Sequence, residues 1–170
     1  EIENSEFGYN GAGDGLTHQL YVGNIRSLSV IGSYFHHANV GHLIKSRALK
    51  NYILYNRLTD EIDGRASYEL EFPNGGETYL IGNIIQQSAQ TSNSTLISFG
   101  AEGYAASPSE LYVVSNTLVN DHPQGGAFMR VSPGAQVVMT RNNLLIGKGR
   151  FHAPAIRDSA GDVWEDWDIF

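Results

Sequence analysis

The sequence predicts an all-β solenoid, in which short strands wind repeatedly around one axis. An apolar segment that ends in a small or amide residue recurs along the chain at spacings of 23 to 33 residues. A shorter strand-like segment lies between successive copies. No window of a dozen residues carries the 3.6-residue apolar periodicity of an amphipathic helix. Such a period, with two or three strands per repeat, is typical of stacked coils.

The recurrent segment predicts two strands joined by a tight bend. Its copies occupy residues 29–35, 52–58, 79–85, 112–118 and 138–144, with a degenerate copy at 2–7. The equivalent bend residues are Ser5, Ser33, Asn56, Asn83, Asn116 and Asn142. Asn suits this place because it tolerates the left-handed conformation and its amide can hydrogen-bond to the coils on both sides. Six unrelated surface turns are the alternative, but the repeated apolar context favours a ladder.

The segment between successive copies predicts a further strand. These strands are His18–Val22, His42–Ser46, Tyr68–Phe72, Thr95–Phe99 and Ala127–Val131. Stacked coils lie about 4.8 Å apart, so equivalent side chains form ladders. With Ile44 and Leu70 facing inward, we expect one outward ladder of Tyr21, Lys45, Glu71, Ser98 and Arg130. A parallel outward ladder comprises Gln19, Leu43, Glu69, Leu96 and Phe128.

The two ends of the chain differ from the repeats. We predict one solenoid domain over residues 1–157 and a C-terminal capping tail over residues 158–170, which are acidic and aromatic. A cap is expected because the open edge of a last coil would aggregate, and an interaction motif is the alternative. No comparable cap precedes Ile2. We therefore expect missing N-terminal coils or an oligomer partner to cover that edge.

Composition narrows the classes of function. The 170 residues suit one domain, and 11 Lys and Arg against 18 Asp and Glu give a net charge of −7. That charge argues against nucleic acids and anionic membranes as partners. The absence of Cys excludes disulfides and thiolate chemistry. There is neither a membrane-length apolar run nor a signal peptide, and we expect a trimmed or processed secreted, periplasmic or cell-surface protein.

The repeat resembles the right-handed parallel β-helix of the pectate-lyase-like superfamily, with about six coils. Within it, residues 43–46 and 50–53 are similar to polysaccharide lyases of the chondroitinase B and alginate lyase type. The resemblance implies that Lys45 is the general base, that an Arg one coil later assists it, and that acidic residues just upstream hold calcium. This chain has no carboxylate in residues 36–42 and no Arg in residues 68–72.

Lyase chemistry needs a base for the proton beside a uronate carboxylate and a cation that neutralises that carboxylate. Lys45 is the candidate base, with Arg47 or Arg130 meeting the uronate and Tyr21 or a His protonating the leaving oxygen. His42, Arg130 and Gln19 are the candidate substrate contacts. Glu71, one coil away, favours the charged form of Lys45 and so opposes the assignment of Lys45 as the base. The alternative is a cross-coil salt bridge on a solvated face.

Hydrolase chemistry needs two carboxylates that flank the bond to be cleaved. Glu69 and Glu71 lie two residues apart, so their Cα atoms are expected about 6.6 Å apart. Asp60, Glu61 and Asp63 on the preceding loop either join them or, with their several oxygens, bind calcium. A solvated acidic loop is the alternative.

The sequence therefore predicts a carbohydrate-active protein. Our first hypothesis is a polysaccharide lyase that acts on a uronate-containing polysaccharide or oligosaccharide by β-elimination, with calcium as the only candidate cofactor. The second hypothesis is a non-catalytic β-helix module that has a binding or structural role within a larger surface or secreted protein. A glycoside hydrolase with paired carboxylates is the third.

Overall fold

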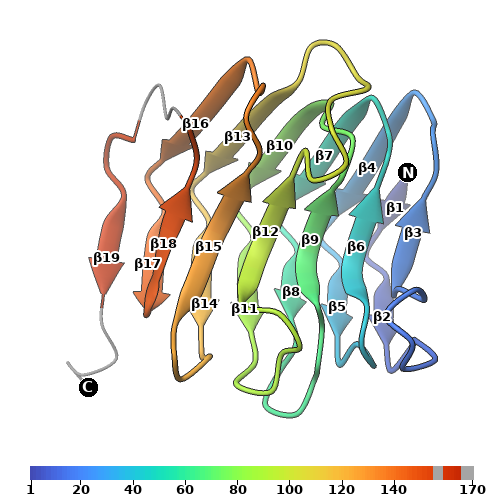
Figure 1. Ribbon diagram of the computed structural model, residues 1–170. Coiled ribbons are helices and arrows are strands. Elements are labelled where there is room, and N and C mark those ends of the chain that lie inside the picture. Colours follow the sequence, from blue (N-terminus) through green and yellow to red (C-terminus); the bar gives the residue numbers. More distant parts are fainter. Residues whose placement is uncertain (155–158, 166–170) are drawn as a thin grey trace.

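The chain folds as a right-handed parallel β-helix of six coils (Figure 1). The computed structural model describes residues 1–154 and 159–165, and no helix occurs among them. Each coil contributes one strand to each of three sheets, and every pairing between strands is parallel. In that described part, no helix is long and apolar enough to cross a membrane.

The three sheets, here called A, B and C, run the length of the molecule. Sheet A consists of β1 (Ile2–Glu3), β4 (Ser27–Ile31), β7 (Lys50–Leu54), β10 (Glu77–Ile81), β13 (Glu110–Val114) and β16 (Val137–Arg141). Sheet B consists of β2 (Glu6–Gly8), β5 (Tyr34–His36), β8 (Arg57–Thr59), β11 (Ile84–Gln87), β14 (Thr117–Asn120), β17 (Leu144–Gly147) and β19 (Val163–Glu165). Sheet C consists of β3 (Leu20–Val22), β6 (His42–Ser46), β9 (Tyr68–Phe72), β12 (Thr95–Phe99), β15 (Gly126–Val131) and β18 (Gly149–His152).

The bend between sheets A and B carries the predicted ladder of small and amide residues. The ladder comprises Ser5, Ser33, Asn56, Asn83, Asn116, Asn143 and Asp162. The backbone N–H of each member donates to the side-chain oxygen of the next, at 2.9 to 3.1 Å. Buried backbone donors are thus satisfied from coil to coil.

The prediction that Asn142 belongs to this ladder is wrong, because its neighbour Asn143 takes the place. The residue before each ladder member is left-handed, with φ of 58° at Tyr55, 55° at Ser115 and 55° at Asn142. Two consecutive Asn residues suit both positions, since Asn tolerates the left-handed region better than other side chains do. The bend therefore starts one residue later in the sequence than the pattern suggested.

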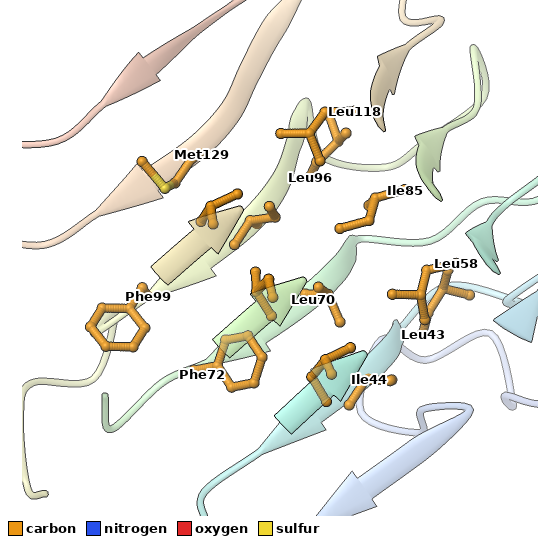
Figure 2. Close-up of a cluster of buried hydrophobic side chains, with 14 of the residues drawn as sticks. Leu43, Ile44, Leu58, Leu70, Phe72, Ile85, Leu96, Phe99, Leu118 and Met129 are labelled. Atoms are coloured by element: carbon orange, nitrogen blue, oxygen red, sulfur yellow. The ribbon is translucent and has the colours of Figure 1, made fainter. Parts of the chain in front are cut away.

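The core is a column of apolar side chains between the sheets. Figure 2 shows Ile44, Leu70, Phe72 and Phe99 from sheet C in one cluster with Leu58, Ile85 and Leu118 from sheet B. Each of these side chains is completely buried, which contributes about 1.5–3 kcal/mol per side chain. The strand predictions for β6, β9 and β12 are confirmed to the residue.

The second outward ladder predicted on sheet C is wrong. Leu43, Glu69, Leu96 and Phe128 each expose 0 % of their surface. Leu43 and Ile44 are consecutive residues, and both belong to the apolar core. Strict alternation holds only for a flat strand, whereas the coil turns inward where sheet C begins. Two successive residues therefore face the interior there.

The described part of the C-terminal segment extends the β-helix. Strand β19 pairs with β17 in sheet B, and the Trp164 ring lies 5.7 Å from that of Phe128 and 5.2 Å from that of Phe151. These contacts suit a cap over the last coil. Residues 155–158 and 166–170 of the predicted tail and its boundary lie outside the described residues.

Candidate functional site

The outer face of sheet C gathers polar side chains from successive coils. Its six strands lie side by side in the front layer of Figure 1. The predicted register is confirmed there: Tyr21 pairs with Lys45, Lys45 with Glu71, Glu71 with Ser98, and Ser98 with Arg130. Side chains from residues far apart in the sequence thus form one continuous row on this face.

Glu71 is the centre of the row in the N-terminal coils. Its Oε2 lies 2.8 Å from Lys45 Nζ and 3.0 Å from His42 Nε2, and the three side chains expose only 6 to 15 %. Burial raises the pKa of Glu71, but the contacts with His42 and Lys45 outweigh it and lower the pKa to about 2. Glu71 is therefore a carboxylate at neutral pH, and Lys45 is its ion-pair partner.

Arg47 joins this cluster from the end of β6. Its Nη1 lies 2.8 Å from Glu102 Oε2, and its Nη2 donates to Glu102 Oε1 at 2.9 Å. Its Nε donates to the Tyr21 hydroxyl at 3.0 Å, and Nη1 donates to Asn74. The hydrogen bond to Glu102 is the main cause of a raised Arg47 pKa. Glu102 also lies 3.5 Å from Lys45 Nζ, so one carboxylate bridges both cations.

Two histidines stack beside the ion pairs. The His18 and His42 rings lie 4.3 Å apart and 17° from parallel, as their alignment in adjacent coils suggested. His18 Nδ1 accepts the backbone N–H of His42 at 3.0 Å. Burial, and then the proximity of His42, lower the pKa of His18 to about 4. His18 is therefore neutral at pH 7, with Nδ1 occupied and its proton on Nε2.

The other predicted substrate contacts do not join this cluster. Gln19 is buried, where it accepts from Asn10 at 2.6 Å and donates to the His36 carbonyl at 2.7 Å. Arg130 lies on the same row as Lys45, three rungs away, which corresponds to about 14 Å. The row therefore has two separate regions.

The carboxylates predicted for hydrolysis do not face one another. Glu71 contacts cations on the outer face, whereas Glu69 is completely buried at a rung between Leu43 and Leu96. Neither carboxyl oxygen of Glu69 has a hydrogen-bond partner among the residues that the structure describes. Burial first, and then the charge of Asp60, raise its pKa well above the usual value. Glu69 is therefore not placed to act with Glu71 on a sugar at the outer face.

The three acids predicted to bind calcium point to different partners. Asp60 is buried and accepts two backbone N–H groups. Glu61 accepts from Arg57 at 2.6 Å, and Asp63 lies 3.0 Å from His37. Within residues 1–154 and 159–165, no group of three or more His, Asp or Glu side chains is placed to hold a metal ion.

Sequence reasoning missed Asn74 and Glu102, which complete the surroundings of Arg47. Asn74 follows Arg47 by 27 positions, close to the coil period, and Glu102 follows after a similar interval. The period could have found both residues had the ladders been extended beyond the strand ends into the loops. Comparison with protein-family models, curated proteins and solved structures finds no significant match to this chain.

Proposed function

We propose that this protein binds an acidic polysaccharide across the outer face of sheet C and cleaves it by β-elimination. The observation that carries the proposal is the meeting of two cations, Lys45 and Arg47, with the exposed phenol of Tyr21. The resemblance of the repeat to the pectate-lyase-like superfamily supports the same class of chemistry. A polysaccharide substrate would place the protein outside the cytoplasm.

The cations would neutralise the uronate carboxylate. Glu102 already bridges Lys45 and Arg47, which shows that a carboxylate fits between them. Its side chain is 46 % exposed and lies on a loop, so a substrate carboxylate can replace it. Because Lys45 forms an ion pair with Glu71, we assign Lys45 to charge neutralisation rather than to proton removal.

Tyr21 would transfer the proton. Its side chain is 54 % exposed, and its oxygen accepts an N–H from Arg47. In the proposed step, Tyr21 acts as the phenolate: its oxygen takes the C5–H proton, the electron pair of that C–H bond forms the C4–C5 double bond, and the C4–O bond breaks. The leaving oxygen then takes a proton from Tyr21. The Arg47 guanidinium stabilises the negative charge that develops on the phenol oxygen.

The proposal is tested by ultraviolet absorbance, because elimination creates an unsaturated uronate. Purified protein is assayed against polygalacturonate, alginate and chondroitin sulfate, with and without calcium, while reducing ends are measured in parallel. We expect absorbance and reducing ends to rise together with one polymer. Reducing ends without absorbance would indicate hydrolysis and contradict the proposal.

A non-catalytic glycan-binding module is the second candidate. This candidate is favoured because Lys45 and Arg47 both already contact carboxylates of the protein itself. Such a module would retard an acidic polysaccharide in gel electrophoresis and generate no new ends. The two candidates therefore predict different outcomes in the same samples.

A further inference from the structure

The C-terminal coils carry a second group of basic side chains on the outer face of sheet C. Arg130 in β15 and Arg150 and His152 in β18 are exposed, and all three line one groove together with His122. Within the described residues, none of these three side chains has an ion pair or a hydrogen bond. Among the described residues of this acidic chain, with its net charge of −7, three basic side chains thus lie together without an acidic partner.

Four basic side chains of the earlier coils are arranged differently. Lys45, Arg47, Lys50 and Arg57 each contact a glutamate at 2.6 to 2.8 Å. An isolated group of basic side chains repels itself unless an anion joins it. The contrast therefore indicates a binding place for an anion rather than a solvated charged face.

The register aligns this group with the site at Tyr21. Arg130 pairs with His152 on one side and with Ser98 on the other, and Ser98 pairs with Glu71. Ser98 is small and only 1 % exposed, so its own side chain does not project from the row between the two regions. A chain molecule that lies along the axis of the β-helix would cross both.

We propose that Arg130, Arg150 and His152 form an oxyanion-binding subsite for a carboxylate or sulfate group of an acidic polysaccharide. Guanidinium groups bind such oxyanions through two parallel N–H donors. The identity of the ligand as a polysaccharide rests on the proposed function, whereas the presence of an oxyanion site does not. The subsite would hold the polymer about 14 Å from Lys45, three strand spacings along the sheet.

The test uses the full chain and its retention on immobilised polymers. Arg130→Gln with Arg150→Gln is compared with a control that removes two positive charges elsewhere, Arg57→Gln with Arg65→Gln. Circular dichroism first establishes that both double variants are folded. We expect the first variant to bind polygalacturonate or dextran sulfate at least about tenfold more weakly, since each lost bond to a charged group is worth about a factor of ten. The control should stay within about twofold.

Equal losses in the two double variants would overturn the proposal, as would equally strong binding to neutral dextran. Stronger binding to polygalacturonate would identify a carboxylate as the ligand, and stronger binding to dextran sulfate a sulfate. If binding depends on Arg130 and Arg150 but no unsaturated product forms, the subsite stands and β-elimination fails. If product forms and the KM of the two double variants is the same, β-elimination stands and the subsite fails.

Discussion

A carboxylic acid lies in the apolar interior at Glu69. Its rung is shared with Leu43 and Leu96, and its oxygens have no hydrogen-bond partner among the described residues. Ionising such a group in an apolar environment is so costly that it stays protonated instead. The alternation of residues 68–72 predicted that Glu69 faces outward. That prediction is wrong because a sequence pattern does not show where a coil turns inward.

Replacing Glu69 with Leu should stabilise the protein at neutral pH by about 1–3 kcal/mol, because it removes an unsatisfied polar group. The raised pKa means that the folded state holds a proton that the unfolded state has lost above about pH 4.5. The free energy of unfolding of the wild type therefore falls as the pH rises above that value. Urea unfolding between pH 5 and pH 8 measures both effects.

Glu69→Gln is the matched control. It removes the titration but leaves a buried polar side chain, so its advantage over the wild type should also grow with pH while its stability stays below that of Glu69→Leu. A constant difference between wild type and both variants across this pH range would show that Glu69 does not titrate as described.

Glu102 contacts both cations of the proposed site. Its carboxylate bridges Arg47 and Lys45, in the place proposed for the substrate carboxylate. Glu102→Gln should therefore strengthen binding of an acidic polysaccharide several-fold, because it releases Arg47 and removes one of the two carboxylates beside Lys45. Glu77→Gln is the control, since Glu77 contacts Lys50 at 2.8 Å on sheet A. Weaker binding by Glu102→Gln, or the same gain in both variants, would contradict this role.

At the scale of elements, the A–B bend depends on two adjacent residues with different tasks. Asn143 accepts the backbone N–H of Asn116 and donates to the Val113 carbonyl at 2.8 Å. Asn142 supplies the left-handed turn. The repeat predicted the ladder, but two consecutive Asn residues leave its register ambiguous in the sequence. Only the backbone angles distinguish them.

Asn143→Ala should destabilise the protein by about 2–4 kcal/mol, because it leaves buried backbone groups without partners. Asn142→Gly should change stability by less than about 1 kcal/mol, because Gly adopts the left-handed conformation readily. Thermal or urea unfolding of the two variants measures this difference. Similar losses in both variants would be inconsistent with the assigned register.

At the scale of the whole molecule, the stacking of the coils determines which residues far apart in the sequence become neighbours. The repeat predicted the solenoid, and the ladder predicted the row from Tyr21 to Arg130, which the register confirms. Net charge did not show that Lys45, Arg130 and Arg150 lie on sheet C, because composition carries no position. The loop residue Glu102 was missed because the predicted ladders end with the strands, although the coil period continues into the loops.

The most direct test of the central claim is the rate of ultraviolet-absorbing product from the wild type and from Tyr21→Phe, on the polymer that the wild type prefers. Tyr55→Phe is the control, because Tyr55 is 66 % exposed at the bend between sheets A and B, away from this face. We expect Tyr21→Phe to lose about 10²- to 10⁴-fold in kcat, as for removal of a proton-transfer group, and Tyr55→Phe to remain active. Two results would contradict the assignment of this face as an elimination site. One is a folded wild type that forms no unsaturated product from any uronate polymer. The other is a Tyr21→Phe variant that is as active as the control.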